Sequence, residues 1–218
     1  MRFSLSLALA LLIALTGTRG SAAADGERKS DYVRPDGNTL VRSQYRGDIY
    51  LLRGFADVFS RGVDELGRKL EERGIEVHVV SHGAWASGAA EIVANQKKYG
   101  HKPVILIGHS LGANAVILMA KRLRKENIQV EYLVTFAATA PDPVPDNVGK
   151  VDNYYFETHG WGEKVVGDTG FHGDMENKDY SQASDIGHFN IDKQADIHEQ
   201  VIRNVLHYMQ PSRRKAQS

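Results

Sequence analysis

One short stretch of the chain joins a hydroxyl side chain to the backbone pattern that makes such a group reactive. Residues 104–112 read Val-Ile-Leu-Ile-Gly-His-Ser-Leu-Gly, which places Ser110 in the pattern Gly-x-Ser-x-Gly. In this pattern a strand turns sharply into a helix and lifts the serine above the edge of a sheet. Gly108 and Gly112 are required because a Cβ at either position would clash with the adjoining strand and helix. Ser110 is therefore the candidate nucleophile.

The residues on either side of this turn supply the strand and the helix that it needs. Residues 104–107 form a short apolar run, as in a buried parallel strand, and residues 113–125 have helical periodicity. The apolar face of that helix consists of Val116, Ile117, Met119, Ala120 and Leu123. With this context the chain resembles the α/β-hydrolase superfamily, in which lipases and esterases often carry Gly-His-Ser-Leu-Gly.

A serine hydroxyl needs a base that takes its proton, and the resemblance implies the chain order serine, acid, histidine. His188 fits this order, since it follows Gly187 and comes just before the last helical segment. The alternatives are histidines inside that helix or in the preceding loop: His198, His207, His159 and His172. The two helical histidines are expected at the surface, so we predict that His188 is the base.

The acid of the triad departs from the family pattern. In pancreatic-type lipases it ends the strand after the nucleophile strand, and the corresponding position here is Ala137. Asp142, five residues later, is the nearest carboxylate and is taken as the predicted acid, with an Asp-Pro turn residue as the competing interpretation. Four later carboxylates remain as alternatives: Glu157, Glu163, Asp168 and Asp174.

Negative charge that develops on a substrate oxygen requires fixed hydrogen-bond donors. The backbone N–H of Leu111, directly after the serine, is one predicted donor of such an oxyanion hole. The resemblance places the second donor after the first strand, and this implies the N–H of Phe55. The family often has histidine before the preceding glycine, whereas this chain has Arg53.

The elements that must position these groups alternate along the chain between strands and helices. Strands are predicted at 49–52, 75–80, 104–107, 130–136 and 151–157, and helices at 58–73, 84–99, 113–125 and 192–209. This order predicts an α/β fold with a mostly parallel, doubly wound sheet: a compact, minimal α/β hydrolase over residues 45–210 without a large lid. Residues 159–187 lack periodicity and are predicted to form a long functional loop.

The first residues have the composition of an export signal. Arg2 precedes an apolar run over residues 5–15, and small residues at 22–24 offer a cleavage site, so residues 1–24 are predicted to be a signal peptide. An uncleaved anchor is the alternative, and no stable membrane span is expected after cleavage. Residues 25–44 are predicted to be a polar leader and residues 211–218 a disordered tail. The chain has no cysteine, whereas small domains of the eukaryotic secretory route often have disulfides. For an exported chain we therefore expect a bacterial periplasmic or secreted protein.

Composition also narrows the function. Without Arg2 and Arg19 the chain is close to neutral, which argues against a nucleic-acid partner. Loop histidines and carboxylates match no compact ligand motif, so we expect no metal and no cofactor. The sequence thus predicts a serine-dependent carboxylic-ester hydrolase that acts on a small-molecule or lipid ester. A thioesterase or acyltransferase with the same residues, and a non-catalytic binding protein of this fold, are the alternatives.

Overall fold

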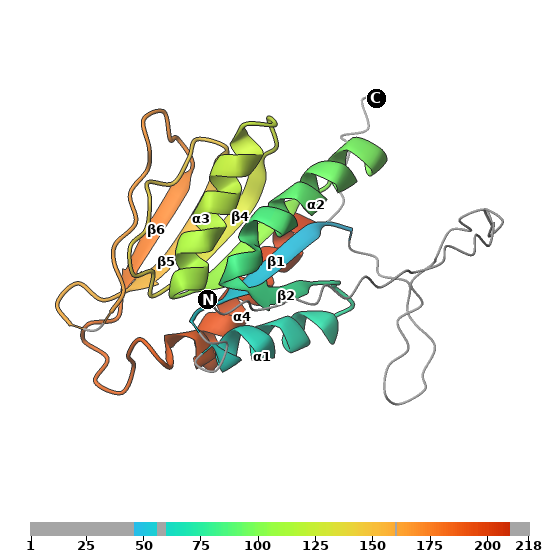
Figure 1. Ribbon diagram of the computed structural model, residues 1–218. Helices are drawn as coiled ribbons and strands as arrows, with labels where there is room; N and C mark the ends of the chain where they lie inside the picture. Colours follow the sequence, from blue (N-terminus) through green and yellow to red (C-terminus); the bar gives the residue numbers. More distant parts are fainter. Residues whose placement is uncertain (1–45, 56–59, 160, 210–218) are drawn as a thin grey trace, which may run out of the picture. The chain divides into compact units, whose positions relative to one another are not determined.

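The computed structural model describes residues 46–55, 60–159 and 161–209, which form a six-stranded parallel sheet with helices on both faces (Figure 1). The predicted signal peptide, the leader and the tail lie outside the described residues. The strands are β1 (Asp48–Arg53), β2 (His78–Ser81), β3 (Val104–His109), β4 (Val130–Phe136), β5 (Val148–Tyr155) and β6 (Asp174–Asp179). Their order in the sheet is β2-β1-β3-β4-β5-β6, and every neighbouring pair is parallel. The predicted α/β fold class is confirmed.

Two hydrophobic layers hold the helices against the sheet. Alternate residues of β1 point to opposite faces: Ile49 and Leu51 join one core cluster, and Tyr50 and Leu52 join the other. Helices α1 (Arg61–Glu71) and α4 (Ala195–Met209) cover the first face, and α2 (Trp85–Tyr99) and α3 (Leu111–Arg124) cover the second. In Figure 1, α2 and α3 stand in front of the sheet and α4 lies behind it.

The strand order places a crevice between β1 and β3. The chain passes from β1 to β2 on one side of β1 and then continues with β3 on its other side. At such a switch point the loops that leave the two strands diverge to opposite faces, so a ligand site forms beyond their carboxyl ends.

Helix α3 ends at Arg124 and β4 begins at Val130, so no lid is inserted there. In the described part of the chain, no helix is both long enough and apolar enough to cross a bilayer.

Strand β6 corrects the prediction that residues 159–187 form a loop throughout. The strand sequence is Asp-Met-Glu-Asn-Lys-Asp, so it lacks the apolar alternation by which strands are recognised. Its charges are paired instead: Lys150 of β5 binds both Asp174 and Glu176 at 2.7 Å. Charged side chains are typical of an edge strand, where they oppose pairing with another molecule.

A buried carboxylate connects the segment before α4 to the start of α1. Asp192 is fully buried, and one of its oxygens accepts a hydrogen bond from the N–H of Gly62 at 3.0 Å. It thereby satisfies a backbone donor that the first turn of α1 leaves unpaired. Its other oxygen has no hydrogen-bond partner, and desolvation raises the pKa of Asp192 to about 6.

We predict that replacing Asp192 by asparagine changes how stability depends on pH. Because the pKa is raised from 3.8 to about 6, the folded state holds a proton that the unfolded state releases, so stability falls as pH rises through this window. The full loss amounts to about 3 kcal/mol. Asparagine cannot ionise but still offers an oxygen to Gly62. The free energy of unfolding of the wild type, relative to the variant, should fall between pH 4 and 6 and level off above pH 7 in urea titrations. A difference that is constant over this range would contradict the prediction.

Candidate active site

The turn between β3 and α3 places Ser110 in a backbone conformation that few residues adopt. Ser110 has φ 57° and ψ −121°, and its N–H donates to the carbonyl of Phe136 at 2.9 Å. The two glycines leave no space for side chains: a Cβ on Gly108 would lie 2.2 Å from the carbonyl oxygen of Gly112, and a Cβ on Gly112 would lie 2.1 Å from that of Leu52. Such strain is retained where the surrounding structure enforces it, often at functional sites.

The structure brings Ser110 and His188 together, although they are 78 positions apart in the sequence. The Nε2 atom of His188 lies 3.0 Å from the Ser110 hydroxyl oxygen, and both residues are more than nine-tenths buried. The Nδ1 atom of His188 lies 2.5 Å from the backbone carbonyl oxygen of Trp161. A carbonyl oxygen only accepts, so Nδ1 carries the proton and Nε2 is free to accept the proton of the serine. This is the arrangement of a general base and its nucleophile.

Burial keeps this base neutral. Desolvation lowers the pKa of His188, and the hydrogen bond to Trp161 only partly opposes the shift. The rings of Trp161 and Phe189 stand edge-on to the imidazole, with centroid distances of 5.7 Å and 5.0 Å. A neutral imidazole can take a proton at pH 7, so the environment suits the role of a base.

The structure does not bring Asp142, the predicted acid, to His188. The carboxylate of Asp142 is half-exposed and forms a salt bridge with Lys121 of α3 at 2.9 Å. The hydrogen-bond position at Nδ1 of His188, where a triad acid would bind, is occupied by the Trp161 carbonyl. Asp142 is therefore a surface ion-pair residue, and its prediction as the orienting acid is not supported by this geometry.

Three of the four later carboxylates also have partners of their own. Glu157 accepts from the Tyr155 hydroxyl, Asp168 from Arg124, and Asp174 from Lys150, while Glu163 lines an open groove. The Nδ1 atom of His188 bonds to the Trp161 carbonyl and to none of these carboxylates. The structure instead offers a backbone dipole as the orienting group for the base.

Ala137 explains how the carbonyl reaches this position. Ala137 is fully buried, and a Cβ on Gly162 would lie 2.8 Å from its Cα, so the two backbones are in contact. The N–H of Glu163 donates to the carbonyl of Ala138 at 2.7 Å and fixes the segment there. A longer side chain at position 137 would displace this segment. The small residue at position 137 thus lets the 161–163 backbone approach His188.

A buried chain of hydrogen bonds supports the base from the other side. The Nε2–H of His109 donates to the backbone carbonyl of His188 at 2.7 Å, and its Nδ1 accepts from the hydroxyl of Ser60 at 2.9 Å. The Ser60 oxygen in turn accepts from the N–H of Gly54 at 2.7 Å. Desolvation lowers the pKa of His109, which favours the neutral form that this pattern requires. His109 lies inside the serine motif, but nothing in its sequence position indicates these partners.

Both predicted oxyanion donors lie beside Ser110. Leu111 is the first residue of α3, where backbone N–H groups lack partners within the helix. Gly54 follows β1, and a Cβ there would lie 3.0 Å from Cβ of Ser110, so the peptide that leads to Phe55 passes close to the nucleophile.

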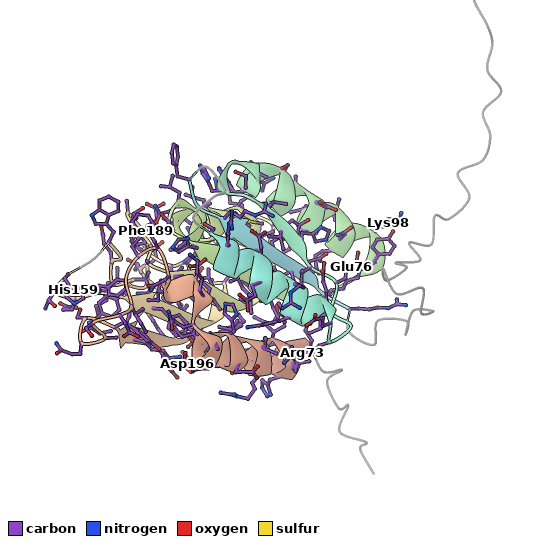
Figure 2. All side chains as sticks on the ribbon, turned by 90° about the horizontal axis from the view of Figure 1, so that it is seen from below. Arg73, Glu76, Lys98, His159, Phe189 and Asp196 are labelled. Atoms are coloured by element: carbon purple, nitrogen blue, oxygen red, sulfur yellow. The ribbon has the colours of Figure 1, made fainter. Side chains whose placement is uncertain are left out.

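Two hollows adjoin at this site. A cavity of about 260 Å³ contains Ser110 and His188 and is bounded by three exposed aromatic side chains, Phe55, Trp161 and Phe189. A more open groove of about 730 Å³ shares the walls Thr139 and Trp161 with this cavity. The residues found only in the groove are Tyr155, Phe156, Glu157, Gly162, Glu163 and Lys164. In Figure 2, Phe189 lies at the end of the domain opposite Glu76 and Lys98.

The four histidines that were alternatives to His188 are not bonded to Ser110. His198 corrects the expectation of a surface histidine in the terminal helix, because it is fully buried and bonds to the backbone carbonyl of Asp192 at 2.6 Å. His159 and His172 bond to backbone carbonyls of their own loop region, and His207 is exposed. Within the described ranges, no three histidine, aspartate or glutamate residues are grouped as a metal site would need.

The structure thus combines a parallel α/β sheet, a strained serine turn between β3 and α3, and a histidine that follows the last strand and bonds to that serine. No protein-family model and no curated protein matches the sequence. Among solved structures, the NocB thioesterase domain, in a covalent complex with a fluorophosphonate nocardicin G analog, matches with 12% identity and a TM-score of 0.42. That match covers 77% of this chain and 96% of the other. YbtT, the type II thioesterase of the yersiniabactin pathway, matches with 12% identity and a TM-score of 0.38, over 75% and 95% of the two chains.

The lowered pKa of His188 predicts how the reactivity of Ser110 depends on pH. Only neutral His188 accepts the serine proton, so kcat/KM should fall as pH drops through a midpoint below 6.5. A pH profile of ester hydrolysis from pH 4.5 to 8.5 measures this midpoint. The same limb should persist in Asp192→Asn, which separates the titration of His188 from that of Asp192, whose pKa is raised to about 6. A midpoint above 6.5 would instead indicate that a carboxylate supports the base.

Proposed function

We propose that this protein is a serine-dependent carboxylic-ester hydrolase. The observation that carries the proposal is the 3.0 Å contact between Ser110 and His188 in a buried cavity at the switch point of the sheet. A neutral histidine with its acceptor nitrogen toward a strained serine serves proton transfer and has no evident use in passive binding. This argues against the alternative of a non-catalytic binding protein of the same fold.

The proposed mechanism follows from the atoms in place. The Ser110 oxygen attacks the ester carbonyl while Nε2 of His188 takes the hydroxyl proton. The carbonyl oxygen becomes an oxyanion that accepts from the N–H groups of Leu111 and Phe55. The tetrahedral intermediate collapses, the carbon–oxygen bond to the alcohol breaks, and His188 returns its proton to the departing oxygen. Water, deprotonated by His188, then releases the acyl group and regenerates Ser110.

The orienting group in this mechanism is the carbonyl of Trp161. It fixes the tautomer of His188 and its dipole faces the imidazolium that forms during the reaction. A carboxylate would add a full negative charge, so the carbonyl stabilises the imidazolium less.

We also propose that the protein acts in the bacterial periplasm or outside the cell. The signal-like composition of residues 1–24 supports this location.

A fluorophosphonate probe tests the nucleophile. We expect the wild type to be labelled and to hydrolyse p-nitrophenyl butyrate, and Ser110→Ala to lose both properties while it remains folded by circular dichroism. Asp142→Asn serves as the matched control, because an ion pair half exposed to solvent contributes little, and its kcat should change less than about twofold. A folded wild type that is neither labelled nor active would remove the enzyme proposal. A large loss in Asp142→Asn would restore that residue as the acid.

Butyryl esters of an alcohol and of the matched thiol, compared in parallel, distinguish an esterase from a thioesterase.

The two adjoining hollows suggest how an ester lies in the site. The departing alcohol must reach Nε2 of His188, and His188 bonds to Trp161, the wall that the cavity shares with the groove. We therefore place the alcohol portion along the groove, which contains Glu157, Glu163 and Lys164, and a short acyl group in the aromatic-rimmed cavity.

This placement predicts opposite responses to the two halves of the substrate. The cavity of about 260 Å³ is smaller than typical ligand pockets, so kcat/KM should decline for acyl chains longer than about six carbons. The open groove should tolerate a bulky polar alcohol, such as glycerol or a sugar, with less than about a threefold change. Kinetics on a series of p-nitrophenyl acyl esters and on butyrate esters of different alcohols measure both responses. Equal tolerance for long acyl chains would reverse the assignment of the two hollows.

A further inference from the structure

The backbone of Gly54 lies against the proposed nucleophile and is held by hydrogen bonds at both of its polar groups. Its N–H donates to the hydroxyl oxygen of Ser60 at 2.7 Å, and its carbonyl oxygen lies 3.2 Å from Nδ1 of His82. A carbonyl oxygen only accepts, so Nδ1 of His82 must carry the proton in this contact. His82 is partly buried and begins the 3₁₀ turn His82–Ala84 directly after β2, the strand that neighbours β1.

The Gly54 carbonyl and the Phe55 N–H belong to one peptide group. The described chain contains no cis peptide bond, so this group is trans and planar, and its C=O and N–H point in opposite directions. A donor that fixes the carbonyl therefore also fixes the direction of the N–H. Rotating this peptide would break the bond to His82.

The cavity around Ser110 lies on the N–H side of this peptide. Gly54, Phe55, Ser110 and Leu111 all line the cavity, whereas His82 does not. The carbonyl thus points out of the cavity toward His82, and the N–H of Phe55 points into it, beside the N–H of Leu111. Ser60, which His109 holds in turn, anchors the preceding N–H and stops the turn from shifting as a whole.

We propose that His82 is a positioning residue for the oxyanion hole: it holds the Gly54 carbonyl so that the Phe55 N–H faces the reacting carbonyl oxygen. The inference rests on the proposed function, because it concerns the donor that the hydrolysis would use. His82 does not line the cavity that contains Ser110, and it acts only through the backbone of Gly54. It belongs to β2–α2 rather than to either element that carries the nucleophile or the base, and its role adds a third element to the site.

The experiment compares four variants on p-nitrophenyl butyrate and on an alkyl trifluoromethyl ketone of similar length. The Ser110 oxygen adds to the ketone carbonyl and forms a hemiketal whose oxyanion occupies the same oxyanion hole. The inhibition constant of the ketone therefore measures directly how well the hole binds an oxyanion. His82→Ala removes the donor, and His82→Phe keeps a ring without the donor in case the smaller side chain unfolds the turn. His82→Asn supplies an amide N–H near the place of Nδ1. His172→Ala is the matched control, because the Nδ1 of that histidine also donates to a backbone carbonyl, but in an exposed loop.

We expect His82→Ala and His82→Phe to lower kcat about tenfold with KM nearly unchanged, less than the 10²–10³ typical of removing an oxyanion donor outright. The inhibition constant of the ketone should rise by a similar factor. His82→Asn should recover most of both losses, and His172→Ala should match the wild type. The inference is overturned if ketone affinity stays at the wild-type value in the folded variants, or if His82→Asn is no better than His82→Ala. A wild type that neither turns over the ester nor binds the ketone rejects the proposed function itself, and this inference with it.

Discussion

The close approach of three backbones around Ser110 is the constraint on which the site depends. Gly54 at the end of β1, Ser110 at the end of β3 and Gly112 at the start of α3 are in contact, and a Cβ on Gly112 would collide with the carbonyl of Leu52. Because no side chain separates these segments, the N–H groups of Phe55 and Leu111 lie beside the serine. The parallel order β2-β1-β3 then leaves the space beyond them open, since the following segments turn toward opposite faces of the sheet.

Hydrogen bonds from outside the catalytic pair hold the rest of the geometry. One path runs from Gly54 through Ser60 and His109 to the backbone of His188, so the turn that carries the proposed oxyanion donor and the proposed base share an anchor. Each group in this path is buried, and each donates a hydrogen bond to the next group along the path, from the Gly54 N–H to the His188 carbonyl. A buried polar group that lost its partner would cost about 1–3 kcal/mol, which makes alternative arrangements of the path unfavourable.

The parts of this protein that depend on local patterns were predictable from the sequence, and those that depend on distant contacts were not. The strands near Val104 and Val130 and the helices after them have strong periodicity, and the serine turn has its glycines, so the α/β fold class followed from them. Strand β6 was missed because its residues are charged and its stability comes from Lys150 on the neighbouring strand. The Trp161 carbonyl was missed because every residue has a backbone carbonyl, and only the packing of Gly162 on Ala137 places this one.

The packing of Gly162 on Ala137 also explains why Asp142, although predicted as the acid, is not the group that orients His188. Proximity in sequence to the expected acid position made it the nearest choice, but its salt bridge to Lys121 lies on the exposed side of α3. At position 137 an alanine with φ 48° turns the chain after β4, and the 161–163 segment fills the space that an aspartate would need. Replacing a charge by a carbonyl reduces the stabilisation of imidazolium but also spares the fold a buried carboxylate, whose desolvation is costly, as the raised pKa of Asp192 shows. The base is thus oriented by a neutral group whose hydrogen bond raises the pKa of His188, and burial, the larger effect, lowers that pKa and keeps the imidazole uncharged.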